Sequence, residues 1–367
     1  MLDLTRLMRR AGRVMTGVDR VELAYARALV DDPVPLHALI RSRWGYILLD
    51  ADGVSTILGG ITGGSADIWQ VARRVARGRA VPPLLGWMLR RAGLSGCHYI
   101  NVGHSNLTLR VLATLRTIDA HIAVLLHDVI PLDFPQFQRD GTSAKFAAML
   151  GRVAAHSDLI IYNSADTLSR ARRHMKREVP SIVAHLGTDL VAPERTMDVP
   201  SEPYFICVGT IEPRKNHAFL FDLWDEMGAN APHLIIAGNR GWNNEAVFAR
   251  LDAQPTEARI VERAGLNDHQ IAALIKGAKG LLFPSFAEGY GLPAVEAVAL
   301  GTPVVVNDLP VYREVLGDIP IYASVSDRYL WINKVRALAE TARGEATRKQ
   351  YTPPTWADHF KTVLRLT

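Results

Sequence analysis

Short apolar runs that end in polar or glycine-containing turns recur in both halves of the chain, and each is followed by a stretch of helical periodicity. Because strands joined through helices run parallel, this alternation predicts parallel sheets flanked by helices. The runs of the N-terminal half are CHYINVG (97–103), HIAVLLHDVIP (121–131) and DLIIYNSA (158–165). Those of the C-terminal half are YFICVGT (204–210), HLIIAGN (233–239), ARIVERAG (258–265), GLLFPS (280–285) and TPVVVND (302–308). The sequence therefore predicts an α/β protein with two doubly wound sheets in tandem.

The length of the chain, 367 residues, suits two domains better than one. A polar, proline-bearing stretch between residues 190 and 202 lacks periodicity and predicts the boundary. We therefore expect an N-terminal domain over 1–192, a C-terminal domain over 200–345 and a final segment over 346–367. The final segment holds a predicted helix with Thr355 as its N-cap and with one apolar face, made by Trp356, Phe360, Val363 and Leu364.

One stretch of the N-terminal half departs from this pattern. The run WGYILLDADGVSTIL (44–58) has turn residues at Asp52 and Gly53 between two apolar segments, which predicts a hairpin. The first domain is therefore expected to differ from a pure Rossmann sheet.

Composition indicates an ordinary globular protein, with 48% apolar and 22% charged residues. Cys97 and Cys207 have no Cys or His neighbours at metal-ligand spacing, so neither a disulfide framework nor a zinc site is predicted. The N-terminus begins with an acid and lacks the apolar core of a secretory signal, and no run is long enough to span a membrane. A cytoplasmic location is the expectation, with peripheral attachment to the inner face of the cell membrane as an extension of it.

A net charge of +5 and a pI near 9.2 favour anionic partners. The segment 68–93 carries Arg73, Arg74, Arg77, Arg79, Arg90 and Arg91 without an acid, interleaved with Trp69, Leu84, Leu85, Trp87 and Met88. Such a segment can lie along an anionic bilayer, with rings in the interface and guanidinium groups among the headgroups. The alternative is two surface helices with a solvated basic face. A nucleic-acid partner is not predicted.

Two glutamates flank a glycine-proline junction in EGYGLPAVEAVALG (288–301). Pro293 suits the first turn of a helix and Gly301 its end, which places Glu288 in the preceding loop and Glu296 on the first turn. The glycines between them allow a ligand to approach the backbone, and the helix N-terminus offers N–H groups to an anion. A nucleotide-sugar has this shape, with a diphosphate between a ribose and a sugar. A solvated loop acid and an acid favoured by the helix dipole are the alternative.

A second stretch, VGTIEPRKNHAFLFDLW (208–224), ends a predicted strand at Gly209 and begins a helix near Asn216 or His217. The turn between them carries Arg214 and Lys215. Open α/β sheets bind ligands at the carboxyl ends of their strands, so these two cations are placed to neutralise a diphosphate.

These two motifs, GTIEPRKN and PSFAEGYGLPAVEAVALGTPVV, resemble the C-terminal donor-binding domain of the family 4 retaining glycosyltransferases over about residues 204–316. That family has the GT-B fold, in which two Rossmann-like domains face a central cleft and the last helix commonly crosses back to the first domain. The resemblance implies the same architecture here. It also implies a metal-independent hexosyltransferase that needs no cofactor beyond its co-substrate, GDP-mannose or a UDP-sugar.

The resemblance also implies roles for single residues. Glu288 would contact the donor sugar, Glu296 the ribose and Lys215 the diphosphate. Many members have an arginine where this chain has Thr210, and Arg214 is a candidate to replace that charge. Backbone near the nucleobase would come from Arg263 to Leu266. The full set of implied donor-binding residues is Gly17, Gly209, Thr210, Arg214, Lys215, Arg263, Leu266, Glu288, Gly289, Tyr290, Gly291, Leu292 and Glu296.

The N-terminal half resembles the family less closely. MTGVDRVELAYARAL (15–29) resembles the turn that brings Gly17 to the donor phosphates, and LLHDVIPLDFP (125–135) resembles a turn in a subgroup often acting on mannose, with His127 near the donor sugar. A histidine packed at a strand end is the alternative for His127. His104, Asn106 and Asp128 are candidates for the acceptor side. The predicted catalytic residues are His127, Glu288, Arg214 and Lys215.

The predicted function is therefore transfer of a hexose, with mannose favoured, to a saccharide or lipid-linked acceptor in surface polysaccharide or lipopolysaccharide biosynthesis. The alternatives are a hydrolase that uses both glutamates as acid and base, a nucleotide-sugar epimerase of the same fold, and a non-catalytic sugar-nucleotide-binding protein. Asp50-Ala51-Asp52 is a DxD tripeptide that holds a metal in the other main glycosyltransferase fold. Because glycine follows it in a predicted hairpin, we expect a turn there and no metal site.

Overall fold

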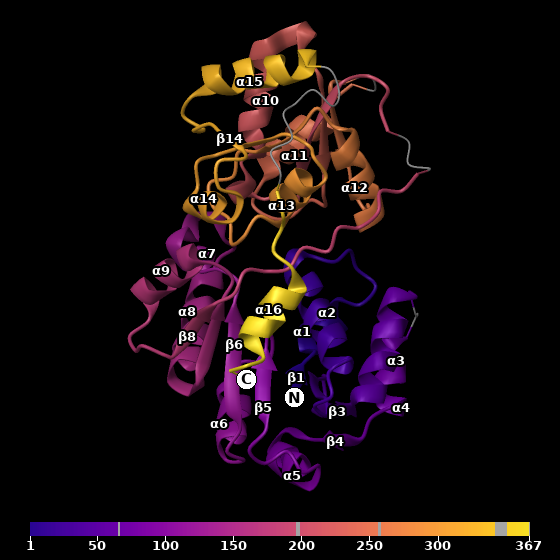
Figure 1. Ribbon diagram of the computed structural model, residues 1–367, viewed down its shortest axis with the longest axis vertical. Coiled ribbons are helices and arrows are strands. Elements are labelled where there is room, and N and C mark those ends of the chain that lie inside the picture. The colour runs from indigo at the N-terminus through magenta and orange to yellow at the C-terminus, as the bar shows by residue number, and fades with distance from the viewer. Residues whose placement is uncertain (65–66, 196–198, 256–257, 342–350, 367) are drawn as a thin grey trace. The chain divides into compact units, whose positions relative to one another are not determined.

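The computed structural model describes residues 1–64, 67–195, 199–255, 258–341 and 351–366. It divides into two compact units (Figure 1). Unit 1 consists of Met1–Val129, Ala144–Leu186 and Trp356–Thr367, and unit 2 of Ile130–Ser143 and Gly187–Thr355. Each unit has one sheet with helices packed on it, so the predicted α/β class with two Rossmann-like sheets is confirmed.

Unit 1 is built on an eight-stranded sheet with the order β4-β3-β2-β1-β5-β6-β7-β8. Six of these strands, from β2 to β8 in that order, pair in parallel, whereas β3 and β4 run antiparallel to their neighbours. The strands are β1 (Leu2–Asp3), β2 (His37–Arg41), β3 (Tyr46–Asp50), β4 (Gly78–Ala80), β5 (His98–Asn101), β6 (His121–Leu126), β7 (Leu159–Tyr162) and β8 (Ser181–Val183). The expected departure from a pure Rossmann sheet is therefore confirmed.

The hairpin itself was predicted in the wrong place. The hairpin is formed by β2 and β3, and the residues after β3 form helix α3 (Ala51–Thr62) in place of a second strand. Asp50 is the N-cap of this helix, because its Oδ1 accepts the Gly53 backbone N–H at 2.9 Å. Val54, Ile57 and Leu58 recur at helical spacing and are buried. The Asp52-Gly53 pair thus belongs to the first turn of a helix.

The other helices of unit 1 are α1 (Thr5–Arg10), α2 (Gly17–Val30), α4 (Ile68–Arg74), α5 (Leu85–Arg91), α6 (Leu109–Arg116), α9 (Ala165–His174), α16 (Trp356–Val363) and most of α8 (Thr142–His156). Helix α16 lies beside α2 (Figure 1), and aromatic rings of the two helices pack together. The Tyr25 ring centroid lies 5.4 Å from that of His359 and 5.0 Å from that of Phe360. Val363 is fully buried, so the expected apolar face of this helix is used in packing.

The buried His359 makes a testable contribution to the pH dependence of folding. Its Nε2 lies 2.7 Å from the Tyr25 hydroxyl and its Nδ1 2.9 Å from the His185 carbonyl, and burial lowers its pKa from 6.5 to about 4. In the unfolded chain His359 is therefore protonated below pH 6.5, whereas in the folded chain it is protonated only below about pH 4. The stability that a neutral His359 confers is complete above pH 6.5 and is lost as the pH falls toward 4.

We expect His359→Gln to remove this proton uptake. Urea unfolding at neutral pH and at pH near 4 should show the advantage of the wild type over the variant shrinking by about 3 kcal/mol. Groups such as Asp3 and Glu22, whose pKa values burial raises, are present in both proteins and cancel in the difference. A pH-independent difference would contradict the assignment.

Unit 2 is built on a six-stranded, wholly parallel sheet with the order β11-β10-β9-β12-β13-β14. The strands are β9 (Tyr204–Val208), β10 (His233–Ala237), β11 (Ile260–Arg263), β12 (Gly280–Phe283), β13 (Val304–Val306) and β14 (Ile321–Tyr322). The helices are α7 (Ile130–Asp133), α10 (His217–Met227), α11 (Glu245–Asp252), α12 (Asp268–Gly277), α13 (Leu292–Ala299), α14 (Pro310–Leu316) and α15 (Arg328–Glu340). Its core packs Phe205, Trp224, Leu282 and Trp331 between sheet and helices. The predicted strands of this half all form.

The units differ from the expected domain boundaries in three places. Residues 187–192, expected in the first domain, fall in unit 2, as do 351–355, expected in the final segment. The third difference is Ile130–Ser143, which lies inside the expected first domain but belongs to unit 2. There the Phe137 ring stacks on that of Phe286 at 5.4 Å, and the Trp242 indole N–H donates to the Phe137 carbonyl at 3.0 Å. Residues 342–350 lie outside the described residues.

Within the described ranges, no helix combines the length and the apolar character needed to cross a bilayer.

Candidate functional site

The candidate site of unit 2 lies where the strand order reverses. From β9 the chain proceeds to β10 and β11 on one side, then returns to place β12 on the other side of β9. In open α/β sheets, ligands bind at the carboxyl ends of the strands beside such a reversal. Both sequence motifs meet here, because Gly209 to Lys215 follow β9 and Pro284 to Glu288 follow β12.

Hydrogen bonds tie the two loops together. The Phe286 backbone N–H donates to the Arg214 carbonyl at 2.8 Å, and Arg214 Nη1 donates to the Ala287 carbonyl at 2.9 Å. The amide of Asn216, a residue in the left-handed conformation between a 3₁₀ turn (Pro213–Lys215) and α10, donates to the Pro284 carbonyl at 3.2 Å. The loops therefore form one structure, and the basic turn holds a fixed position against the glutamate loop.

The structure brings three of the predicted site residues into direct contact. Glu288 Oε1 lies 2.6 Å from Lys215 Nζ, and its Oε2 lies 2.9 Å from Arg214 Nη1. On its other side, Arg214 Nε lies 2.7 Å from Glu212 Oε1. Glu212, Lys215 and Glu288 are buried, whereas Arg214 keeps 21% of its side chain exposed. We call these four residues the charge cluster.

Burial and charge oppose each other at Glu288. Burial alone would raise the pKa of its carboxyl group, but the charges of Arg214 and Lys215 outweigh burial and lower the pKa to about 2. Burial lowers the pKa of Lys215, and the neighbouring Glu288 acts in the opposite direction. At neutral pH Glu288 is thus an ionised hydrogen-bond acceptor and not a proton donor, which argues against its use as a glycosidase acid.

The end of the Lys215 side chain also lies close to Gly209 and to the Phe283 ring. Gly209 has a φ of +134°, and a Cβ added there would lie 3.3 Å from the Lys215 Cε. The Lys215 Nζ also lies 4.4 Å from the centroid of the buried Phe283 ring. A side chain at position 209 would therefore crowd the lysine, and the predicted importance of this glycine has a steric reason.

Helix α13 begins at Leu292, with Gly291 as its N-cap and Pro293 in its first turn, as predicted. One part of the prediction was wrong, because Glu296 is the fifth residue of the helix and no acid lies in the first turn. The cause is that the helix begins at Leu292, which puts Glu296 one position beyond the first turn. Glu296 is half-buried, and no residue in the first turn of the helix is acidic.

Gly291 is fixed both by its backbone and by its neighbour. Its φ is +87°, and a Cβ there would lie 2.5 Å from Cε1 of the buried Tyr312 ring. We expect Gly291→Ala to lower the free energy of unfolding by about 2–4 kcal/mol, through backbone strain and overpacking together. Gly93→Ala is the matched control, because Gly93 ends α5 with a φ of +73° in a left-handed cap but has open space around its Cβ position. Equal losses in urea titrations of the two variants would contradict the steric argument.

The remaining predicted donor-binding residues of unit 2 have no demonstrated role. Thr210 packs on Gly241, where a Cβ would lie 2.8 Å from the threonine methyl group. Gly289, Tyr290 and Leu292 lie in the loop and first turn leading into α13, and Tyr290 is buried. Arg263 ends the edge strand β11, and its carbonyl accepts the Gly238 N–H at 3.0 Å; Leu266 follows it in the next loop. Their roles stay predictions.

In unit 1 the predicted residues gather at the carboxyl ends of β5 and β6. The His104 and His127 rings lie 5.1 Å apart, and burial lowers their pKa values to about 4 and about 3. His104 Nε2 contacts the Leu125 carbonyl at 2.9 Å, and His127 Nε2 contacts the Val102 carbonyl at 2.7 Å. Both rings are therefore neutral near pH 7. Their roles with the acceptor and the donor sugar stay predictions.

Asn106 makes a mainly structural contact in unit 1. Its amide donates to Asp3 Oδ2 at 2.7 Å, and the Tyr99 hydroxyl donates to the same oxygen at 2.9 Å. Asp128 follows His127 and is half-buried, and Gly17 is the exposed first residue of α2. Asp50 caps α3, as described above. No group of three or more His, Cys, Asp or Glu side chains in the part of the chain described here is arranged to hold a metal ion.

Two residues of the site were not assigned a role by sequence reasoning. Glu212 lies within the motif GTIEPRKN, close in sequence to two cations, and this proximity could have predicted its ion pair with Arg214. Tyr312 lies on α14, outside both motifs, and nothing in its sequence context indicates contact with Gly291. Only the fold brings it to the site.

Comparison with known proteins adds sequence relatives for this region. Residues 195–340 match the family described as Glycosyl transferases group 1. The serotype-specific mannosyltransferase WbdA of Escherichia coli is 29% identical over 234 residues, which cover 58% of this chain and 29% of that protein. O-antigen chain mannosyltransferase B of Escherichia coli is 32% identical over 161 residues, which cover 40% of this chain and 42% of that protein. The chain thus spans less than half the length of either relative.

A solved structure is similar over nearly the whole chain. Alr3699/HepE of Anabaena, in complex with UDP and glucose, matches with a TM-score of 0.64 and 15% identity, covering 95% of this chain and 92% of that one. At this identity the likeness establishes the fold, which is GT-B, as predicted.

Proposed function

We propose that the protein is a retaining hexosyltransferase, because residues 195–340 match the glycosyl transferases group 1 family. The substrate pair would be a nucleoside-diphosphate sugar, with GDP-mannose favoured over UDP-sugars, and a hydroxyl of a lipid-linked or polysaccharide acceptor. The product would belong to surface polysaccharide biosynthesis. The observation that carries the proposal is the charge cluster beside the N-terminus of α13 at the strand-order reversal.

The cluster can supply the electrostatics of this reaction. When the bond between the sugar C1 and the phosphate oxygen breaks, its electron pair and negative charge pass to the diphosphate. Arg214, Lys215 and the N–H groups at the start of α13 would stabilise that charge without a metal ion. The acceptor oxygen would bond to C1 on the same face, and its proton would pass to the leaving phosphate oxygen. The anomeric configuration is then retained.

Glu288 would act as a hydrogen-bond acceptor for the donor sugar. Its carboxylate is ionised, as described above, and its two oxygens already face Lys215 and Arg214. A sugar hydroxyl can donate to a carboxylate oxygen while the cations keep it charged. Glu296, on the second turn of α13, is proposed to contact the ribose.

The choice of mannose rests on the names of the sequence relatives, and the nucleoside-diphosphate donor on the UDP bound in the similar structure. A thermal-shift screen over GDP-, UDP-, dTDP- and ADP-sugars tests the donor. A true donor at about 100 times its Kd should add about 2.7 kcal/mol of stability. No shift with any of the four would contradict the proposal.

The reaction itself is tested with the best donor and a lipid-linked saccharide acceptor, with NMR of the new anomeric centre. Multiple-turnover release of free sugar without acceptor would indicate a hydrolase, and an isomerised donor an epimerase. Transfer that is undiminished in Glu288→Ala would place the chemistry elsewhere. Inversion at the anomeric carbon would contradict the same-face mechanism.

A further inference from the structure

An exposed face of unit 1 combines apolar tips with arginines. We define the docking face as Trp44, Val81, Leu84 and Trp87 with Arg43 and Arg91. The four apolar side chains are 70%, 53%, 50% and 55% exposed. All seven tryptophans lie within the described residues, and only Trp44 and Trp87 are mostly exposed. Two large indoles on one surface are therefore a feature that packing of the core does not explain.

The docking face joins two segments that are distant in sequence. Tyr46 pairs with Ala80 in the antiparallel ladder of β3 and β4, so Trp44 lies beside the residues that follow Val81. The approach is close, because a Cβ on Gly45 would lie 2.1 Å from the Ala80 carbonyl oxygen. The turn between β2 and β3 thus adjoins the segment that runs from β4 into α5.

Helix α5 presents one side to the docking face and buries the other. Leu85, Met88 and Leu89 are buried, and Met88 packs against Gly78 of β4, which lies beside this helix in Figure 1. Trp87 and Arg91 are on the exposed side. Leu85, Met88 and Leu89 already form the buried side of the helix, so the exposed indole of Trp87 is not needed for packing of the core.

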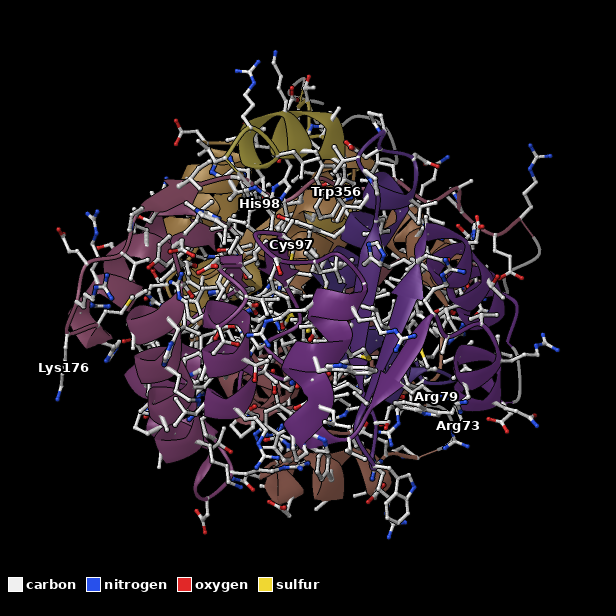
Figure 2. The ribbon with its side chains drawn as sticks, turned by 90° about the horizontal axis from the view of Figure 1, so that it is seen from below. Arg73, Arg79, Cys97, His98, Lys176 and Trp356 are labelled. Atoms are coloured by element: carbon white, nitrogen blue, oxygen red, sulfur yellow. The ribbon has the colours of Figure 1, made fainter. Side chains whose placement is uncertain are left out.

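Each exposed indole is paired with a cation. The guanidinium carbon of Arg43 lies 4.9 Å from the Trp44 ring centroid, and that of Arg91 lies 5.2 Å from the Trp87 centroid. The residues of the docking face come from two stretches of the chain, 33–49 and 68–118, and neither stretch contains Asp or Glu. Figure 2 shows two further arginines, Arg73 and Arg79, on one side of unit 1, with Lys176 on the opposite side.

We propose that the docking face binds an anionic lipid bilayer, with the indoles at the level of the headgroups and the arginines against lipid phosphates. Trp side chains favour the interface and Arg side chains extend to the headgroups while their stems cover apolar surface. Because neither segment of the face contributes an acid, its own residues add no repulsion from an anionic surface. The inference rests on the proposed function for its purpose, because a lipid-linked acceptor is presented at such a surface.

The structure also corrects the predicted extent of this surface. Of the arginines in 68–93, Arg77 is paired with Asp50 at 3.1 Å and Arg90 donates to the Thr117 carbonyl at 2.8 Å. The turn at Arg43 and Trp44, which the sequence did not indicate, takes part instead. Leu85 and Met88, which the sequence places among these arginines, are buried and do not belong to the face.

The experiment is sedimentation of the full chain with vesicles of phosphatidylcholine alone or mixed with phosphatidylglycerol, at low and high salt. We expect binding only to the anionic vesicles and release by salt. Arg43→Ser with Arg91→Ser should weaken binding about thirtyfold, and Trp44→Ser with Trp87→Ser at least about tenfold. Arg172→Ser with Lys176→Ser, and Tyr329→Ser, are the controls, because these side chains are exposed and outside the docking face. They should bind as the wild type does.

Several results would overturn the inference. These are equal binding to neutral vesicles, absence of binding to anionic ones, and full binding by both docking-face variants. Loss of a dimer in sedimentation velocity of the tryptophan variant, without vesicle binding by the wild type, would identify an interface between copies. Thermal melting by circular dichroism checks that each variant folds. Vesicle binding uses no nucleotide-sugar, so its failure is distinct from failure of the donor screen.

Discussion

Lys215→Met is expected to lower the rate of hexosyl transfer by about 10²–10³-fold. The ammonium group of Lys215 is buried and contacts Glu288 at 2.6 Å, in the loop that leads into α13. Methionine keeps much of the side-chain volume but cannot stabilise the charge that develops on a leaving diphosphate. The measurement is kcat with the donor found in the thermal-shift screen, at saturating acceptor.

Lys276→Met is the matched control for this loss. Lys276 is an exposed lysine of α12 in the same unit, outside the charge cluster, so the same chemical change should leave kcat unaltered. If Lys215→Met retained wild-type kcat and raised only KM, its charge would contribute to binding alone and not to the transition state.

The second large effect is on stability. Lys215→Met leaves the Glu288 carboxylate buried with Arg214 as its remaining cation, and Glu288→Gln leaves the Lys215 ammonium buried without its partner. Each single change is expected to cost about 3–5 kcal/mol, because a buried charge loses its compensation. The double variant should cost about 2–3 kcal/mol less than the sum, because it removes both charges together.

Urea unfolding of the four proteins in this double-mutant cycle gives the coupling free energy directly. Arg214→Gln with Glu288→Gln provides a comparison, since Arg214 is more exposed than Lys215 and is also paired with Glu212. Its coupling to Glu288 should be the smaller of the two. Additive losses for Lys215 and Glu288 would show that their 2.6 Å contact contributes little to folding.

The charge cluster changes how Glu288 is understood. The sequence treats Glu288 as an acid in a loop, separate from the cations of the earlier motif. In the structure it is the centre of a cluster with both of them. A carboxyl group with a pKa of about 2 is ionised near neutral pH and has no proton to donate, so Glu288 is not suited to act as a general acid.

The sequence by itself determined the architecture of unit 2 and the place of its site. Short apolar runs that end in turn residues and alternate with helical stretches favour buried parallel strands, and the carboxyl ends of parallel strands share one edge of the sheet. That is why Arg214, Lys215 and Glu288 could be assigned to one region before the structure. Proline and glycine marked α13 in the same way, because their backbone preferences act locally.

Only the tertiary structure decided which partners these residues meet. The pairing of Lys215 with Glu288 and the contact of Tyr312 with Gly291 join residues distant in sequence, so no local pattern encodes them. The helix at Ala51–Thr62 replaced a predicted hairpin because an aspartate cap and buried apolar spacing outweighed a local turn signal. The docking face likewise exists only because the β3–β4 ladder sets Trp44 beside the segment leading into α5.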